Sequence, residues 1–570
     1  MPTLDWIGKK AVLNHHREVP YRLLKCDASL SAGDPDSGNL LIQGDNLLAL
    51  KALLPYYAGK VKCIYIDPPY NTGNEKWVYN DAVNSPEMQR WLGKVVGAEA
   101  EDLSRHDKWL CMMYPRLSLL KDFLTEDGAI FISIDDNEVQ NLRAIMDEVF
   151  GPRNFVSTVI WQKVYSPKNT ARHLSEDHDY IVIYACDSDC WQPHLVSRSE
   201  KQDKAYKNRD NDKRGPWKTV DLSARNFYGA GTYPITCPSG RVITRPPKGR
   251  YWQVSPEKFM GMDADKRIWW GIKGDSIPQI KRFLTEVKQG VVPQTLWTYQ
   301  EVGHTQEAKK ELIAICDFED SASVFISPKP LRLLKRILEI GTDKDSLILD
   351  SFAGSGTTGH AVLALNKQDG GTRRFILAEM EDAISRSITA QRLARAVDGY
   401  ASRTVASISD QREQDRPSEI GATGEPMIPV ERKAGKRVEG LGGGFRYCNL
   451  GEPLFDEAGN IRETVTFPDL AAHVFFTETG APIPKRATAK TPLLGEHNGK
   501  AIYLLFNGVL GDKSTNGGNV LTNEILRGLP GPTIKDGTRV IYGEGCRLGA
   551  ARLKREGIVF KQVPYEIKVG

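Results

Sequence analysis

Residues 65–74 read YIDPPYNTGN, and the proline pair within them sets a firm limit on the local fold. Proline lacks a backbone N–H and fixes φ, so a strand inside a sheet cannot continue through two prolines. The residues just before, CIYI, are apolar and typical of a buried strand. The pattern predicts a buried strand that ends at Asp67, with Pro68, Pro69 and Tyr70 held rigidly at its carboxyl end.

Strand and helix patterns alternate on both sides of this loop. Buried strands are expected before residue 44, before residue 67, and at 129–134, 179–185, 346–350 and 374–380. Amphipathic helices are expected from residue 47, from Pro115 to near Gly128, and at 137–151, 330–341 and 360–367. Such alternation predicts an α/β fold with a doubly wound, mostly parallel sheet.

The α/β pattern is interrupted in the middle of the chain, where Gly, Pro and polar residues become dense. A chain of 570 residues is also too long for one core. The expected parts are an N-terminal extension (1–38), a first α/β half (39–185), an insert (186–320), a second α/β half (321–400), a linker (401–444) and a small α/β or α+β domain (445–570).

The insert concentrates positive charge. Residues 201–260 hold 13 Lys and Arg against 5 Asp and Glu, whereas the whole chain has a net charge of only +4. Aromatic residues are interleaved with these cations, as in surfaces that bind phosphates and unstacked bases. A solvated basic face would give the same composition. The candidate DNA-binding residues are Lys213, Arg214, Arg241, Arg245, Lys248 and Arg250.

A glycine-rich loop, DSFAGSGTTGH, follows the strand expected at 346–350. Gly354, Gly356 and Gly359 form a GxGxxG pattern that lets backbone N–H groups approach a ligand at a helix N-terminus. Glu379 ends the next strand, where an acid commonly binds ribose hydroxyls. His360 stands where a Walker A motif needs lysine. This loop alone permits a nicotinamide dinucleotide, S-adenosylmethionine, or a tight turn without ligand.

Both loops are expected at carboxyl ends of strands, so they can face one cleft. Asp67 and a proline carbonyl could accept both protons of an exocyclic amine and turn its lone pair toward a methyl donor. Tyr70 could stack on a base extruded from the duplex. We therefore expect methyl transfer to a base amine, the alternative being a rigid turn without catalytic function.

The ordered motifs resemble the β class of amino-methylating DNA methyltransferases, in which the catalytic motif precedes the cofactor loop. The matching segments are GDNLLALKALLPYYAGKVKCIYIDPPYNTGN, GAIFISIDDNEVQNLRAIMDEVFG, HDYIVIYA, SPKPLRLLKRIL and DSFAGSGTTGHAVL. The chain is most similar to modification (Mod) subunits of type III restriction–modification systems. The resemblance implies a Rossmann-like methyltransferase sheet with permuted motif order, and it makes the insert a target-recognition region.

The resemblance also implies roles for single residues. Asp67, Pro68, Pro69 and Tyr70 would be catalytic. Asp45 would contact the adenine ring of S-adenosylmethionine, Glu379 its ribose, and Lys329 its methionine end. The complete expected cofactor set is Asp45, Asn46, Lys329, Asp350, Phe352, Ala353, Gly354, Ser355, Gly356, Thr357 and Glu379.

The expected function is N6-adenine methylation of double-stranded DNA by base flipping, in restriction–modification and phage defence. A homodimer and a restriction or helicase (Res-like) partner are implied, and residues 445–570 would contact that partner or DNA. The alternatives are N4-cytosine methylation, a nicotinamide-dependent oxidoreductase, and a non-catalytic DNA-binding subunit.

Location and metal content follow from weaker signals. No apolar run approaches the roughly 20 residues that span a bilayer, and the N-terminus lacks the apolar core of a signal peptide. Nine scattered cysteines suggest reduced thiols. Cys186 and Cys190 have no second ligand pair, so no metal site is expected. We expect a protein of the bacterial or archaeal cytosol, associated with the nucleoid.

Overall fold

The computed structural model describes residues 3–72, 93–94, 104–167, 171–198, 203–288, 290–318, 327–404, 433–488, 490–506, 518–532, 537–565 and 567. Residues 405–432 of the expected linker and residues 321–326, where the second α/β half was expected to begin, lie outside this part. The chain divides into two compact units, residues 194–293 and the remainder.

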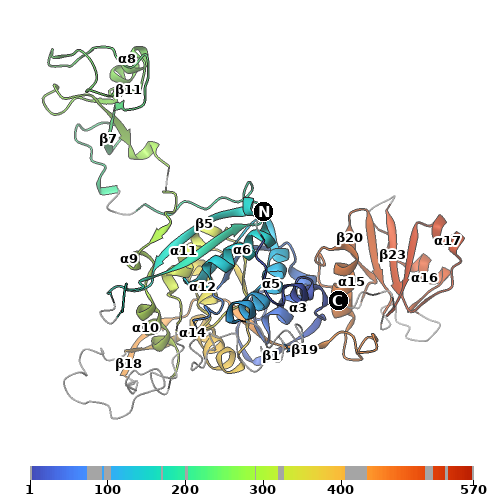
Figure 1. Ribbon diagram of the computed structural model, residues 1–570. Helices are drawn as coiled ribbons and strands as arrows, with labels where there is room; N and C mark the ends of the chain where they lie inside the picture. The colour runs from blue at the N-terminus through green and yellow to red at the C-terminus, as the bar shows by residue number, and fades with distance from the viewer. Residues whose placement is uncertain are drawn as a thin grey trace, which may run out of the picture. The chain divides into compact units, whose positions relative to one another are not determined.

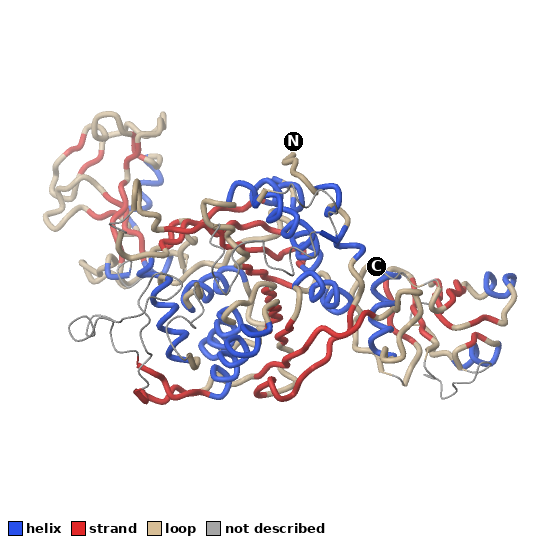
Figure 2. The backbone as a smooth tube through the Cα atoms, turned by 60° about the horizontal axis from the view of Figure 1, so that its bottom comes forward, coloured by secondary structure: helices blue, strands red, loops and turns tan. Residues whose placement is uncertain are grey.

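The larger unit is built on a ten-stranded sheet (Figures 1 and 2). Its order is β1 (Arg22–Gly33), β19 (Gly444–Pro453), β2 (Leu40–Gln43), β16 (Arg374–Glu379), β15 (Leu347–Asp350), β3 (Val61–Ile66), β4 (Leu124–Ile134), β6 (His178–Ala185), β5 (Phe155–Gln162) and β14 (Leu296–Trp297). Six neighbouring pairs are parallel, and the β1–β19, β4–β6 and β5–β6 pairs are antiparallel. The predicted mostly parallel α/β sheet is confirmed.

Helices cover both faces of this sheet. On one face lie α3 (Asn46–Tyr57), α5 (Arg105–Phe123) and α6 (Val139–Phe150), which share one buried core with Ile64, Ile130 and Ile132. On the other lie α11 (Leu331–Gly341), α12 (Thr357–Asp369) and α14 (Gln391–Asp398). Gly341 of α11 packs against Phe131 of β4 and Cys63 of β3. Successive side chains of a strand point to opposite faces of a sheet, so these two side chains lie on the face opposite to that of Ile64, Ile130 and Ile132. The sheet is therefore doubly wound.

Helix α5 differs from its prediction. The helix was expected to open at Pro115, but it begins at Arg105 and contains that proline. Ser104 and Asp107 form a capping box, with Asp107 N–H donating to Ser104 Oγ over 3.2 Å and Ser104 N–H to Asp107 Oδ2 over 3.0 Å. The box satisfies backbone donors at the true start, so the expectation at Pro115 was wrong.

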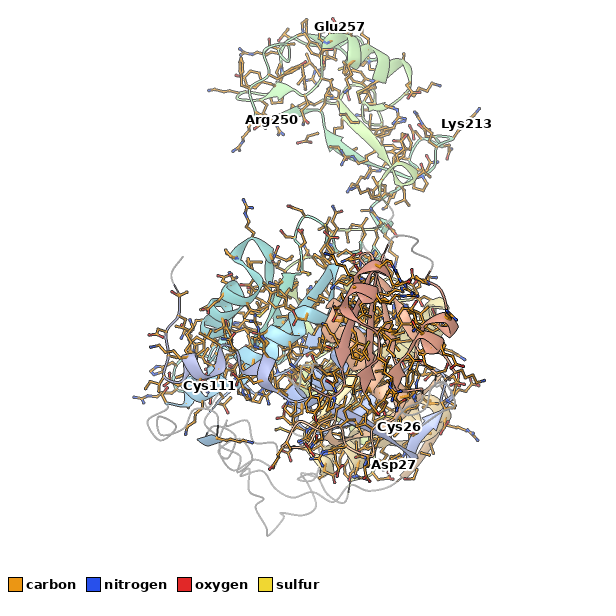
Figure 3. All side chains as sticks on the ribbon, turned by 90° about the vertical axis from the view of Figure 1, so that its right-hand side faces the viewer. Cys26, Asp27, Cys111, Lys213, Arg250 and Glu257 are labelled. Carbon is orange, nitrogen blue, oxygen red and sulfur yellow. A yellow bond between two sulfur atoms is a disulfide. The ribbon has the colours of Figure 1, made fainter. Side chains whose placement is uncertain are left out.

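Two segments far apart in the sequence pair in the main sheet. Strand β1, from the expected N-terminal extension, pairs antiparallel with β19, from the start of the expected C-terminal domain. Cys26 and Cys448 are opposite each other in this pair and form a disulfide, whereas the sequence suggested reduced thiols (Figure 3 labels Cys26). Strand β1 is therefore the edge strand of the main sheet, and β19 lies between β1 and β2.

A second sheet follows β19, with the order β20 (Leu493–His497), β21 (Lys500–Leu504), β23 (Thr538–Gly543) and β25 (Ile558–Gln562). Strands β21, β23 and β25 are parallel, and β20 is antiparallel. Helix α15 (Phe467–Thr479) packs on it, in a core that also contains Tyr21 and Leu23 of the N-terminal segment. This C-terminal part therefore shares its core with the beginning of the chain.

Shorter elements complete the larger unit. They are α1 (Lys9–Val12), α2 (His15–Glu18), η2 (Pro152–Asn154), α9 (Tyr299–Val302), α10 (Thr305–Ile315), α13 (Asp382–Ile384), η4 (Ser385–Ala390), β17 (Gly399–Thr404), β18 (Lys433–Glu439), β22 (Val520–Leu521), α16 (Asn523–Gly528), β24 (Gly545–Cys546) and α17 (Ala550–Arg555). Within the described ranges, no helix is both long and apolar enough to span a bilayer.

The smaller unit, residues 194–293, has its own core. Strands β12 (Ile268–Trp269), β13 (Gln279–Phe283) and β7 (Trp217–Asp221) form an antiparallel sheet. Beside it are the pairs β8 (Ser223–Ala224) with β11 (Tyr251–Trp252) and β9 (Ile235–Thr236) with β10 (Val242–Ile243), the helix α8 (Pro256–Ala264) and the turn η3 (Leu284–Glu286). The unit is shorter than the expected insert 186–320, because β14 and α10 belong to the larger unit.

Candidate active site

The candidate site lies where the direction of strand order reverses. Strand β3 is followed through α5 by β4 on one side, and β15 is followed through α12 by β16 on the other. Strands β3 and β15 are parallel neighbours, with Leu349 opposite Ile64. Their carboxyl ends therefore meet at one edge, which is where open α/β sheets bind ligands. The loops at Asp67 and Asp350 both begin there.

Asp67 is held by a lysine from a distant segment. Lys329 Nζ donates to Asp67 Oδ2, and the side chains of Asp67 and Lys329 are only 22% and 9% exposed. Lys329 was expected at the cofactor's methionine end, and the structure places its ammonium beside the expected catalytic carboxylate. The same ammonium lies 5.1 Å from the centre of the Tyr70 ring.

A buried tryptophan holds the Pro-Pro-Tyr turn in place. Trp109 Nε1 donates to the Pro69 carbonyl over 2.7 Å, and Trp109 is fully buried. Burial, and then the nearby carboxylate of Asp67, raise the pKa of Tyr70 well above its usual range, so its hydroxyl stays neutral. The turn thus presents a ring and carbonyl groups in a defined arrangement.

The residue after the motif continues this support. Asn71 has φ 58° and is buried, and its Nδ2 donates to Arg105 O over 3.1 Å and to Glu138 Oε1. Glu138 is fully buried and also contacts His106 Nδ1 at 2.6 Å. Asparagine tolerates the left-handed region better than most residues. This network holds the chain as it leaves the turn.

The glycine-rich loop is closed by hydrogen bonds of its own. Gly354 has φ 51°, and its N–H donates to Glu379 Oε2 over 2.8 Å. Gly356 has φ 74° and caps α12. Gly359 lies where a Cβ would be 2.7 Å from Leu393 Cδ2. The first two glycines therefore serve the turn, and the third allows the helix to approach its neighbours closely.

Asp350, the last residue of β15, is a buried titratable group at the start of the glycine-rich loop. Burial raises the pKa of its carboxyl to about 7, although hydrogen bonds from Thr358 Oγ1 and Phe352 N–H lower it, and Asp67 and Glu379 raise it further. The influence of Asp67 and Glu379 on one buried group indicates that the two loops share an electrostatic environment.

Asp45 and Asn46 join this environment from the end of β2. Asp45 caps α3 by accepting from Leu48 N–H over 3.1 Å, and Arg116 Nη2 donates to Asp45 Oδ2 over 2.8 Å. Asn46 accepts from Arg116 Nε and donates from Nδ2 to Ser351 O over 3.1 Å. Arg116 therefore links the expected cofactor residues to the glycine-rich loop.

Sequence reasoning missed most of these supporting groups. Arg392 is fully buried and donates to Thr357 Oγ1 over 2.7 Å and Ser355 Oγ over 3.1 Å. Asp179 is buried, pairs with Lys163 at 2.6 Å, and has a pKa that burial raises. A charge inside an otherwise apolar helix could have marked Arg116 and Arg392, whereas no such local signal marks the others. The missed residues are Trp109, Arg116, Glu138, Lys163, Asp179 and Arg392.

The candidate DNA-binding residues all lie in the smaller unit, where Figure 3 labels Lys213 and Arg250. Arg214 pairs with Asp212 and Asp265, and Arg250 pairs with Asp221. Lys213, Arg241, Arg245 and Lys248 are exposed and form no ion pair with any residue that the structure describes. Cations that are already paired have less to gain from phosphate, so these four are the stronger candidates.

The aromatic residues of the basic window divide in the same way. Tyr206, Trp217 and Trp252 are buried in the unit, which excludes them from stacking on bases. Phe227 is 79% exposed and Tyr228 39% exposed. Exposed rings can stack on single-stranded or unstacked bases, so these two are the stronger aromatic candidates.

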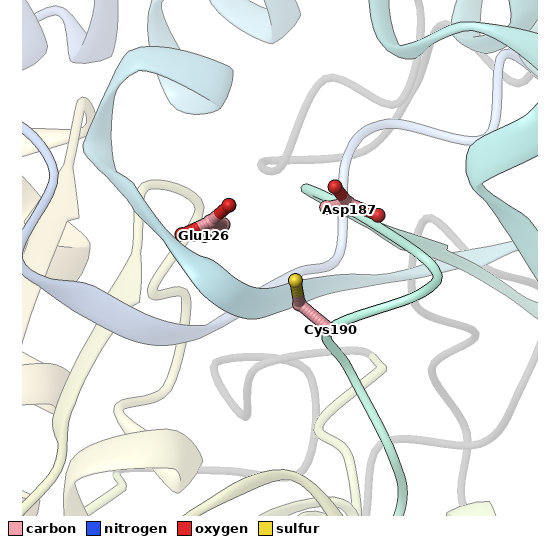
Figure 4. Close-up of side chains that lie close together, drawn as sticks. All are labelled: Glu126, Asp187 and Cys190. Atoms are coloured by element: carbon pink, nitrogen blue, oxygen red, sulfur yellow. The ribbon is translucent and has the colours of Figure 1, made fainter.

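Glu126, Asp187 and Cys190 lie close together in the larger unit (Figure 4). Desolvation and the two carboxylates raise the pKa of the Cys190 thiol. Glu126 and Cys190 are exposed, and exposed acidic groups of this kind occur without any ion. We therefore assign no metal to this cluster.

Comparisons with known proteins agree with this geometry. A DNA methylase family model matches residues 61–391, which is more than half of the chain. The chain is 36% identical over 423 residues to the type III restriction-modification enzyme StyLTI Mod subunit of Salmonella typhimurium, covering 72% of this chain and 62% of that protein. It is 32% identical over 456 residues to the EcoPI Mod subunit of Escherichia phage P1, covering 72% and 68%.

A relative from another class of system is also similar. The type II methyltransferase M.KpnI of Klebsiella pneumoniae is 30% identical over 380 residues, which cover 63% of this chain and 84% of that protein. The chain spans about two thirds of the length of the Mod subunits that it matches.

Proposed function

Because this chain belongs to the DNA methylase family, we propose that it methylates the N6 amine of adenine in double-stranded DNA, with S-adenosylmethionine as donor. We further propose that it is the modification subunit of a type III-like restriction–modification system. The observation that carries the proposal is the position of Asp67 and the 350–359 loop at one switch point of the sheet.

The residues present fit the donor. Gly354 and Gly356 have positive φ and turn the chain tightly into the N-terminus of α12, the end of a helix that favours polar and anionic ligand groups. Asp45 and Glu379 supply carboxylate oxygens, each of which can accept more than one hydrogen bond. When bound, S-adenosylmethionine supplies an electrophilic methyl group on its sulfonium.

Asp67 and the turn that follows it would prepare the amine. The Pro69 carbonyl already accepts from Trp109, so the Pro68 carbonyl is the candidate that accepts one amine proton while Asp67 accepts the other. These two bonds favour a tetrahedral nitrogen whose lone pair can attack. Asp67 is also placed to accept the proton that the amine loses after transfer.

Tyr70 would hold the flipped base by stacking. Lys329 now contacts both Asp67 and the face of Tyr70, so the proposed mechanism requires Lys329 to move aside or share Asp67 when the base arrives. Family membership leaves the nicotinamide-dependent alternative without support. The motif DPPY, rather than a form that begins with serine, favours adenine over cytosine N4.

The test is methyl transfer by Asp67→Asn. The amide keeps the shape but cannot accept a proton, so we expect transfer of labelled methyl groups to fall about 100- to 1,000-fold with nearly unchanged binding of S-adenosylmethionine. Asp36→Asn, on an exposed loop, is the matched control and should keep full activity. Unchanged turnover in Asp67→Asn would falsify the proposed role.

Mass spectrometry of digested DNA decides between N6-methyladenine and N4-methylcytosine.

We propose that the smaller unit binds the DNA backbone through Lys213, Arg241, Arg245 and Lys248. Replacing all four by Glu should weaken DNA binding and reduce the slope of log affinity against log salt by about 0.9 for each phosphate that the variant no longer neutralises. Lys367→Glu, at the exposed end of α12, is the control. An affinity and slope equal to those of the unaltered protein would contradict this assignment.

We also propose that the chain forms a homodimer, binds a Res-like subunit and acts in the bacterial cytosol. Two of the relatives described above are named as subunits of type III enzymes, which supports this assembly. Light scattering of the purified protein and co-purification with a Res subunit from the same operon test it; a monomer that captures no such subunit would refute it.

A further inference from the structure

A cavity lies at the β1–β19 edge of the sheet, several strands away from the candidate active site. Its volume is about 310 Å³, within the range of small-ligand sites. Its walls come from β1, the last turns of α3, β19, α15 and residues 483–486. Ile483 N–H donates to Pro55 O over 3.0 Å and joins two of these walls. Nothing in the proposed methyl transfer uses this cavity.

The walls carry a large excess of positive charge. The cations that line the cavity are Arg22, Lys60, Arg446, Lys485 and Arg486. One acid, Asp469, also lines it, and its Oδ2 already accepts from the N–H and hydroxyl of Thr466. None of the five cations forms an ion pair with a residue in the described part of the chain. The cavity lining therefore carries an excess of positive charge, with five cations against one acid.

Arg446 has a buried donor without a partner among the described residues. Its Nε is buried, and its guanidinium makes no hydrogen bond to any group in the ranges that the structure covers. A buried guanidinium donor without a partner costs free energy. An anion in the cavity would satisfy that donor and the charge together, in the fork geometry that guanidinium offers to phosphate.

Aromatic and apolar groups line the rest of the cavity. Tyr21, Tyr56 and Tyr57 contribute rings, and Leu24 and Pro484 contribute apolar surface. Burial raises the pKa of Tyr57, while the positive charges of Arg446, Arg374 and Arg486 act to lower it. The Tyr57 hydroxyl remains protonated at neutral pH and can donate to an anion.

We propose that this cavity binds a phosphorylated ligand of mononucleotide size, with its phosphates on Arg446 and Arg486 and its base among the tyrosine rings and apolar side chains. One acid against five cations favours a multiply charged phosphate over a singly charged carboxylate. The ring-lined portion favours a nucleotide over a bare inorganic anion.

The experiment is calorimetric titration of the full chain with uridine diphosphate, pyrophosphate and uridine, each with and without S-adenosylhomocysteine. A pyrimidine probe keeps the measurement separate from the adenosine-binding site. We expect saturable binding of uridine diphosphate, weaker binding of pyrophosphate, and none of uridine. Arg446→Gln and Arg486→Gln should each weaken uridine diphosphate binding about tenfold. Arg527→Gln, an exposed cation of α16 outside the cavity, should change nothing.

Three results would overturn the proposal. They are the absence of saturable binding by the unaltered protein, equal binding by Arg446→Gln, and equal affinity for pyrophosphate and uridine diphosphate, which would indicate a simple anion site. Loss of DNA affinity in Arg446→Gln without any nucleotide binding would instead assign the cavity to the DNA backbone. Circular dichroism of both variants establishes that any loss is not a loss of folding.

Discussion

Lys329 places an ammonium group where the proposed reaction needs an amine. Its Nζ donates to Asp67 and lies over the ring of Tyr70, the two interactions that a flipped adenine would make. Sequence analysis identified the Asp67 turn from the proline pair, and Lys329 only from the family motif. Their contact joins residues 262 positions apart, and no local pattern reports such a pairing.

Asp350 should make stability depend on pH. Its carboxyl has a pKa raised to about 7 by burial, so between about pH 4 and pH 7 the folded protein retains a proton that the unfolded chain releases. Stability should therefore fall as pH rises through this window, by up to about 1.4 kcal/mol per pH unit from this group. Asp350→Asn should remove that slope in equilibrium urea unfolding, and a slope unchanged from the original protein would contradict the assignment.

Arg116 should contribute strongly to stability, because it is buried and contacts Asp45, Asn46 and the Met112 carbonyl. Replacing it by Met leaves Asp45 without its cation, and we expect a loss of about 3 kcal/mol in the free energy of unfolding. Arg386→Met removes an exposed pair with Asp382 and should cost much less than Arg116→Met, because exposed ion pairs contribute little to stability. Equal losses in the two variants would show that burial of Arg116 contributes nothing.

At the level of elements, the sequence predicted what depends on local periodicity. The strands before residues 44 and 67 and the helices on both faces follow from apolar spacing. The start of α5 was wrong because Pro115 is a frequent first helical residue, and the capping box at Ser104 was overlooked. The antiparallel direction of β6 could not be predicted, because an apolar run has no direction.

Gly359 tests how closely α12 must pack. An added Cβ would lie 2.7 Å from Leu393 Cδ2 and 3.0 Å from Leu377 Cδ1, so Gly359→Ala should lower the free energy of unfolding by about 1–3 kcal/mol. Gly528→Ala, at the end of α16, meets nothing within 4 Å and should be neutral or slightly stabilising. Urea unfolding of both variants measures the difference, and a neutral Gly359→Ala would show that the helix can shift without cost.

At the scale of the whole molecule, the edge of the main sheet brings together strands that lie far apart in the sequence. Strand β1 pairs with β19 across more than 400 residues, through partners such as Cys26 and Cys448. Sequence analysis placed domain boundaries at residues 38 and 444, where the local composition changes. Strand β1, before the first boundary, and strand β19, at the second, nevertheless belong to the same sheet. The insert was recognised because its composition changes over a long stretch, but its ends were placed outside the compact unit.

This organisation predicts which parts fold alone. Residues 194–293 enclose an apolar core that includes Leu222, Trp252, Phe259 and Trp270, so the excised segment should unfold cooperatively in urea with a change in tryptophan fluorescence. A fragment that starts at residue 454 lacks Tyr21 and Leu23, which complete the core of α15. That fragment should bind a dye for exposed apolar surface and unfold without a sharp transition.

Adding residues 3–33 as a separate peptide should restore cooperativity to the C-terminal fragment, because the peptide supplies both missing core residues. A peptide with Tyr21→Ser and Leu23→Ser is the matched control and should not. If the C-terminal fragment unfolds sharply by itself, its core does not depend on the N-terminal segment. The cavity at the β1–β19 edge would then lie between two independently folding domains. In that case, substitutions that weaken the contact between those domains should also weaken the binding of uridine diphosphate.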